Sequence, residues 1–112
     1  MPIPKVALVT GATRGAGKGI ALGLAAKGMT VYVTGRSAQT ATATLKGETL
    51  SGTLDETVAA INEAGGIGIG ITCDHGDDEQ TRQVFEQIGQ EQQTLDVLVN
   101  NAAYIDDSLI DP

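Results

Sequence analysis

Short apolar runs alternate with segments of helical periodicity along the whole chain. Four runs rich in aliphatic and β-branched residues are typical of buried parallel strands, and they span residues 5–10, 30–35, 67–72 and 95–99. The third run, IGIGIT, alternates isoleucine with glycine. This pattern predicts four strands separated by three longer connections.

Three helices are expected in these connections, because apolar residues there recur every three or four positions. The first is predicted over residues 17–27 and is closed by Gly28. The second opens with a capping box, in which Thr53 is followed three positions later by Glu56, and the third starts near Asp77. The residues that define the apolar repeats are Ile20, Ala21, Leu24 and Ala25, then Leu54, Val58 and Ile61, then Thr81, Val84, Phe85 and Ile88.

The alternation of strands and helices predicts an α/β fold of the Rossmann type, a doubly wound parallel sheet with helices on both faces. About four strands and three helices are expected, and residues 37–52, rich in Ser, Thr, Ala and Gly, are expected to form a loop. Ligands of such sheets bind outside the carboxyl ends of the strands, where the strand order reverses. The segments that follow the strands are therefore the candidate ligand-binding segments: 10–17, 34–37, 73–75 and 100–104.

Charge is divided along the chain. Residues 1–47 carry six basic and no acidic residues, and residues 48–112 carry all fourteen acidic residues and one basic residue. The basic residues stand singly and aromatic residues are scarce, which argues against nucleic-acid binding. A small polyanion held near the first part explains the asymmetry.

Cys73 is the single cysteine, so the chain has no internal disulfide and no cysteine spacing typical of a metal site. The sequence lacks a run of about 18 apolar residues, the length needed to cross a membrane. We therefore predict a cytoplasmic protein without a metal or a membrane partner.

The sequence VTGATRGAGKGIA, between the first strand and the first helix, has the glycine content of a phosphate-holding turn. A P-loop is excluded, because Ala12 stands where its first glycine belongs and Gly19 replaces the hydroxyl residue after Gly-Lys. The spacing Gly11-x-x-x-Gly15-x-Gly17 also differs from Gly-x-Gly-x-x-Gly, but its glycines can serve the same purposes. The first allows a tight exit from the strand, the second a close approach to a pyrophosphate, and the third the packing of helix on strand. The alternative is that the glycines only shape a turn.

Three motifs in order resemble the short-chain dehydrogenase/reductase family: TGATRGAG after the first strand, CD after the third and NNAA after the fourth. The family's usual forms of the first and last are TGxxxGxG and NNAG. Residues 52–80 further resemble the branch that contains dehydrogenase/reductase family member 1. The resemblance covers nearly the whole chain and implies a dinucleotide-dependent oxidoreductase that reduces carbonyls or oxidises alcohols. Its full-length form is then expected to be a homo-oligomer.

The position after the second strand favours NADP over NAD. An NAD-binding fold places an acidic residue there for the ribose 2′-hydroxyl, whereas this chain has Arg36, whose guanidinium suits a 2′-phosphate. Arg14, within the glycine turn, is expected to reach the same phosphate. The alternative is that both arginines are solvated surface residues.

The resemblance also implies a set of cofactor-binding residues. Asp74 would accept a hydrogen bond from the adenine amine beside the Cys73 backbone, Asn101 would line the path to the nicotinamide ribose, and Asn100 would stabilise neighbouring strands. His75 is expected to cap a turn. The full set of expected cofactor-binding residues is Gly11, Thr13, Arg14, Gly15, Ala16, Gly17, Arg36, Cys73, Asp74, Asn101, Ala102 and Ala103.

The family's catalytic groups are a serine and a tyrosine followed four residues later by a lysine. Neither tyrosine meets this pattern, because Arg36 follows Tyr32 and Ser108 follows Tyr104 at that spacing. We therefore expect residues 1–112 to form an NADP-binding half-domain, truncated before the catalytic segment and inactive alone. The alternative is a non-catalytic nucleotide-binding module or sensor, which the mass of the natural polypeptide would distinguish.

Overall fold

The computed structural model describes residues 5–12, 15–35, 54–74 and 76–101, together with the backbone of residues 44–45 and 48–49. Within these ranges the elements are β1 (Val6–Val9), α1 (Gly15–Ala25), β2 (Thr30–Gly35), β3 (Thr44–Leu45), β4 (Glu48–Thr49), α2 (Leu54–Glu63), β5 (Ile67–Thr72), α3 (Asp78–Gln92) and β6 (Val97–Val99). The four strands and three helices expected from the periodicity are confirmed. None of the helices in the described ranges has both the length and the apolar content needed to span a membrane.

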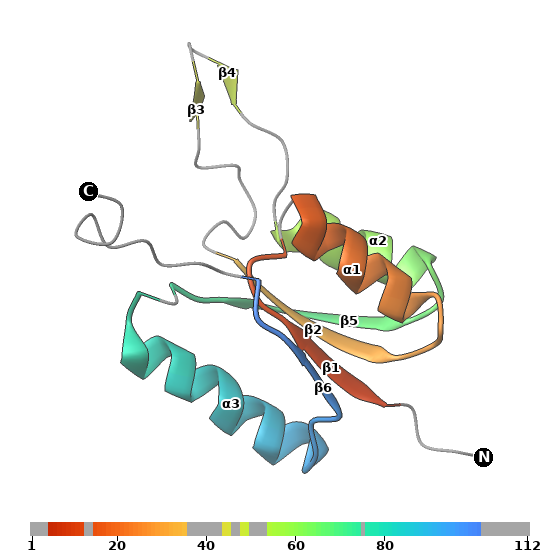
Figure 1. Cartoon of the computed structure of the whole chain (residues 1–112), viewed down its shortest axis with the longest axis vertical. Helices are drawn as coiled ribbons and strands as arrows, with labels where there is room; N and C mark the ends of the chain where they lie inside the picture. Colours follow the sequence, from red (N-terminus) through yellow and green to blue (C-terminus); the bar gives the residue numbers. More distant parts are fainter. Residues whose placement is uncertain are drawn as a thin grey trace, which may run out of the picture.

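The main sheet is parallel and has the strand order β5-β2-β1-β6 (Figure 1). β1 is central, and Val9 pairs with Val33 on one side and with Val99 on the other. The chain moves outward from β1 through β2 to β5 and then returns to the opposite side of β1 as β6. The strand order therefore reverses between β1 and β6, which is where ligands bind in sheets of this class.

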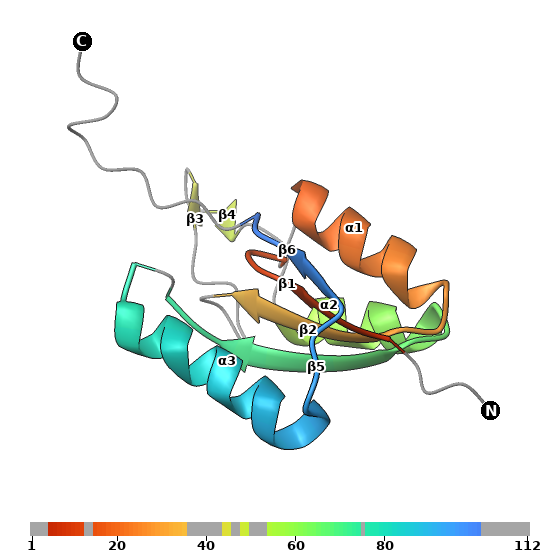
Figure 2. The ribbon, with the colours of Figure 1, turned by 60° about the horizontal axis from the view of Figure 1, so that its bottom comes forward.

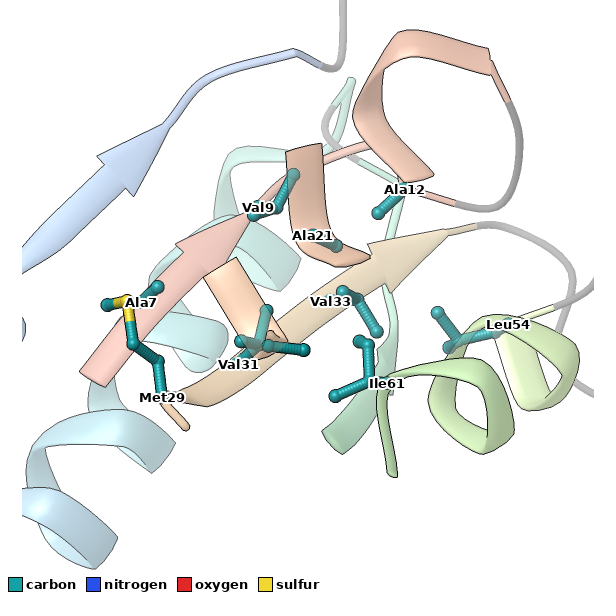
Figure 3. Close-up of a cluster of buried hydrophobic side chains, with 10 residues drawn as sticks. Ala7, Val9, Ala12, Ala21, Met29, Val31, Val33, Leu54 and Ile61 are labelled. Atoms are coloured by element: carbon teal, nitrogen blue, oxygen red, sulfur yellow. The ribbon is translucent and has the colours of Figure 1, made fainter. Parts of the chain in front are cut away.

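Helices cover both faces of the sheet, α1 and α2 on one face and α3 on the other (Figure 2). Successive side chains of a strand point to opposite faces. In β1, Ala7 and Val9 join the core cluster beneath α1 and α2, while Val6 and Leu8 join the cluster beneath α3. Figure 3 shows the first cluster, with Val31 and Val33 of β2 among its members. The doubly wound α/β fold is thus confirmed.

The apolar face predicted for α1 is partly wrong. The helix begins at Gly15, two residues earlier than expected, and its buried residues are Gly17, Ala21 and Ala25. Ile20, predicted as a core residue, is 40% exposed. Small residues at every fourth position allow α1 to lie close to the sheet, and the larger Leu22 and Leu24 pack beside this contact while only partly buried.

The predicted face of α2 is confirmed, and glycines of β5 explain its close packing. A Cβ built on Gly68 would lie 3.0 Å from the Val58 carbonyl oxygen and 3.1 Å from the Ile61 side chain. A Cβ on Gly70 would lie 3.1 Å from the side chain of Leu54. The alternation of isoleucine and glycine therefore leaves room for a helix on one face of the strand.

α3 begins next to Asp77, as the sequence predicted. The Asp77 carboxylate accepts hydrogen bonds from the backbone N–H groups of Glu79 and Gln80, as an N-cap residue does. Val84 and Ile88 are buried against the sheet, but Phe85 is 41% exposed, so its predicted place in the core is wrong. Phe85 follows Val84 directly, and a helix turns by about 100° between successive residues, which directs it away from the sheet.

The prediction of a continuous loop over residues 37–52 is also corrected. β3 and β4 form a two-stranded antiparallel pair there, in which Thr44 is opposite Thr49. Strands of two residues are too short for any alternation of apolar and polar positions to show. Thr53 of the predicted capping box lies outside the described residues.

Candidate functional site

The candidate residues that the structure describes gather at the carboxyl edge of the sheet. Gly11 follows β1, Cys73 and Asp74 follow β5, and Asn101 follows β6. Because the four strands are parallel, these positions lie along one edge, as the sequence predicted (Figure 1). The other predicted positions, Thr13, Arg14, Arg36, His75, Ala102 and Ala103, lie outside the described residues.

The turn after β1 uses glycine where an L side chain is disfavoured. Gly11 and Gly15 have positive φ angles of 64° and 67°. Gly15 and Ala16 are exposed, and a Cβ on Gly15 would meet no atom within 4 Å. The first N–H groups of an α-helix have no partner within the helix and attract anions. The exposed beginning of the 11-residue helix α1 is therefore a position at which an anion can bind.

Gly17 is where α1 meets the turn and the end of β6. A Cβ on Gly17 would lie 2.5 Å from the Gly11 carbonyl oxygen and 2.5 Å from Nδ2 of Asn101. Real Cβ atoms do not approach other atoms so closely, so these contacts require glycine. Gly17 thus allows α1 to lie close to the turn after β1, which is in keeping with the helix packing expected of it.

Asn101 is engaged with the glycine turn. Its side-chain Nδ2 donates a hydrogen bond to the Gly11 carbonyl at 3.0 Å, and its backbone N–H donates to the Thr10 hydroxyl at 2.9 Å. The Thr10 hydroxyl also lies 3.3 Å from Oδ1 of Asn100, to which it can donate. Asn100 and Asn101 therefore both bond the residue that follows β1, and the expected stabilisation of the neighbouring strands by Asn100 stays a prediction.

Two threonines that the sequence did not single out hold the same turn. The Gly11 N–H donates to the Thr34 hydroxyl at 3.3 Å, and the Ala12 N–H donates to the Thr34 carbonyl at 3.0 Å. The Thr57 hydroxyl, on α2, donates to the Ala12 carbonyl at 2.9 Å. Thr57 is fully buried within the apolar face of its helix. A hydroxyl residue in an otherwise apolar face is the feature of the sequence from which this contact could have been predicted.

The end of β5 is shaped by backbone contacts. The Cys73 N–H donates to the Gly35 carbonyl at 2.9 Å, and burial raises the pKa of the Cys73 thiol. Asp74 is exposed, and its carboxylate accepts a hydrogen bond from the Gly76 N–H at 2.9 Å. Asp74 therefore shapes the turn before α3, and its contact with adenine stays a prediction.

The sequence and the fold agree with a family of oxidoreductases. The model of the family described as short chain dehydrogenase matches residues 5–111. The chain therefore belongs to the short-chain dehydrogenase family.

Among its relatives is the human protein named dehydrogenase/reductase SDR family member 1, which is 41% identical over 99 residues. The matched region covers 88% of this chain and 28% of that relative, so the chain spans less than a third of the relative's length.

Two solved structures with bound dinucleotides share the fold. A metagenomic short-chain oxidoreductase in complex with NADP is 30% identical, with a TM-score of 0.74, and the match covers 89% of this chain and 39% of that one. An NADH-dependent reductase complexed with NAD is 24% identical, with a TM-score of 0.70, and the match covers 94% of this chain and 42% of that one. The second likeness shows the fold alone.

Proposed function

We propose that this chain is the dinucleotide-binding part of an NADP(H)-dependent oxidoreductase that reduces carbonyls or oxidises alcohols. The contact of Gly17 with Gly11 and Asn101 is the observation that carries the proposal. It brings the exposed beginning of α1 to the point where the strand order reverses. A dinucleotide bound there would supply the hydride chemistry.

Residues on both sides of this point complete the proposed cofactor site. Gly11, Thr13, Gly15, Ala16 and Gly17 form the pyrophosphate turn. On the β5 side, Cys73 and Asp74 receive the adenine, and on the β6 side Asn101, Ala102 and Ala103 border the nicotinamide ribose. The parallel sheet supports this arrangement, because it places the described members of the set along one edge.

The preference for NADP rests on Arg14 and Arg36. Neither position carries an acidic residue that would accept a hydrogen bond from a ribose 2′-hydroxyl. A guanidinium, in contrast, pairs with a phosphate through two hydrogen bonds. The relative with bound NADP supports this choice. The likeness to the reductase with bound NAD extends only to the fold and carries no argument about the cofactor.

Catalysis in this proposal needs groups from outside residues 1–112. Within them, neither Tyr32 nor Tyr104 is followed four residues later by lysine. We propose that these residues form the cofactor-binding half-domain of a longer cytoplasmic homo-oligomer that acts on a small-molecule substrate. The 112-residue polypeptide mixed with NADPH and a ketone should then show no turnover above background.

Titration of the polypeptide with NADPH and NADH tests cofactor binding and preference. We expect tighter binding of NADPH, and we expect Arg36→Ala to weaken NADPH binding at least about tenfold with little effect on NADH. Lys27→Ala, which removes an exposed charge at the other end of α1, is the matched control. Absence of binding would refute the proposed function, and equal loss of both cofactors in Arg36→Ala would refute the proposed preference.

A further inference from the structure

The buried hydroxyl of Thr57 reaches the glycine turn from a different layer of the fold. Thr57 lies in the first turn of α2, and its hydroxyl donates to the Ala12 carbonyl at 2.9 Å across 45 positions of sequence. Thr57 and Ala12 are both fully buried. This contact joins α2 to the segment that leads into α1.

The other polar backbone groups of the turn are also held. Thr34 accepts hydrogen bonds from the N–H groups of Gly11 and Ala12, and Asn101 donates to the Gly11 carbonyl. Thr57 completes this set by binding the Ala12 carbonyl. The backbone of Gly11 and Ala12 is thus fixed by β2, by the end of β6 and by α2.

We propose that Thr57 is a positioning residue for the dinucleotide, acting through the Ala12 carbonyl. The inference rests on the proposed function, because it concerns how the pyrophosphate turn is held. A buried carbonyl that loses its donor is unfavourable, so the turn shifts to regain a partner. Since Ala12 precedes α1 by three positions, such a shift moves the backbone that presents the first N–H groups of the helix.

Two substitutions at Thr57 separate the hydroxyl from the side-chain volume. Thr57→Val keeps the shape and removes the donor, whereas Thr57→Ser keeps the donor and removes a methyl group. We expect Thr57→Val to weaken NADPH binding about tenfold and Thr57→Ser to restore affinity to within about twofold of wild type. Binding is measured by titration at a temperature at which circular dichroism shows every variant to be folded.

Tyr32→Phe controls for a general loss of stability. Tyr32 is fully buried, and its hydroxyl donates to Glu91 at 2.6 Å on the α3 face of the sheet, away from the turn. This variant also loses a hydroxyl that bonds between two elements, and we expect its NADPH affinity to be unchanged. The melting temperatures of all three variants show whether a loss of NADPH affinity follows a loss of stability.

The outcomes distinguish the inference from the proposed function. If wild type binds NADPH and Thr57→Val binds equally well, the inference is overturned while the proposed function stands. Equal weakening by Thr57→Val and Tyr32→Phe also overturns it, because stability alone then explains the loss. If wild type binds neither dinucleotide, the proposed function fails and the inference fails with it.

Discussion

The side-chain amide of Asn101 donates a hydrogen bond to the carbonyl of Gly11, 90 positions earlier in the sequence. The contact joins the end of β6 to the turn after β1, at the point where the strand order reverses. The same amide lies against Gly17 at the beginning of α1. A single side chain therefore links the ends of β1 and β6 and the first helix beside the proposed cofactor site.

Removal of this amide should loosen the turn. We expect Asn101→Ala to lower the free energy of unfolding by about 1 kcal/mol and to weaken NADPH binding. Asn101→Asp should weaken binding further, because its carboxylate faces a carbonyl oxygen and repels the phosphates. Chemical denaturation and NADPH titration measure the two effects.

Asn62→Ala is the matched control for Asn101. Asn62 also bonds a backbone group through its side chain, by accepting from the Gly68 N–H at 2.9 Å, but it lies near the beginning of β5. We expect this variant to retain NADPH affinity. Equal affinities of the Asn101 and Asn62 variants would contradict a role of Asn101 in holding the turn.

Gly17→Ala should be strongly destabilising. The added methyl group would overlap backbone and side-chain atoms at 2.5 Å, which we expect to cost about 3 kcal/mol or more. Gly23→Ala, in the same helix, adds a methyl group that meets nothing within 4 Å and should be neutral or stabilising by up to about 1 kcal/mol. Thermal denaturation compares them, and similar melting temperatures would refute the close packing at Gly17.

The stability of the chain should fall at high pH, in part through Tyr32. Burial and the hydrogen bond to Glu91 raise the pKa of Tyr32 above its ordinary value of 10.0. The folded state therefore holds this proton more tightly than the unfolded state, so the contribution is fully present below pH 10.0 and is lost as the pH rises through the folded-state pKa.

Tyr32→Phe isolates this contribution, since the other titrating groups are common to both proteins. The difference in free energy of unfolding between wild type and Tyr32→Phe should be constant below about pH 10 and should decline above it. Urea denaturation across this pH range measures the difference. A constant difference at every pH would rule out the linkage.

Cys73 should react slowly in the folded protein. The thiol is buried, and its burial raises the pKa and so lowers the thiolate fraction. We expect its reaction with a disulfide reagent to be at least about a hundredfold slower in buffer than in concentrated urea. Similar rates in the two solutions would show that the thiol is accessible in the native state.

The sequence predicted the larger elements of the fold because their apolar repeats are long enough to recognise. The predicted apolar face of α2 was confirmed, because Leu54, Val58 and Ile61 pack in the core. Ile20 and Phe85 were misplaced, because a periodic pattern does not say which of two adjacent apolar residues makes the closest contact. The β3–β4 pair was missed because its strands have two residues each.

The site was predicted less completely than the fold. The glycines were recognised because positive φ angles and a tight helix contact both require glycine, which is visible in the sequence. Thr34 lies in the expected segment 34–37, but its contact with the turn and that of Thr57 were missed, because these hydroxyls act from positions 23 and 45 residues away. Such contacts depend on the packing of whole elements, which a local motif does not encode.

The glycines of β5 influence a part of the molecule that they do not touch. Because Gly68 and Gly70 lack side chains, α2 rests almost directly on the backbone of β5. The height of the helix above the sheet in turn sets how far the Thr57 hydroxyl is from Ala12. A methyl group on β5, an outer strand, would thus shift the contact between Thr57 and the turn after β1, so the spacing of the layers and the shape of that turn depend on each other.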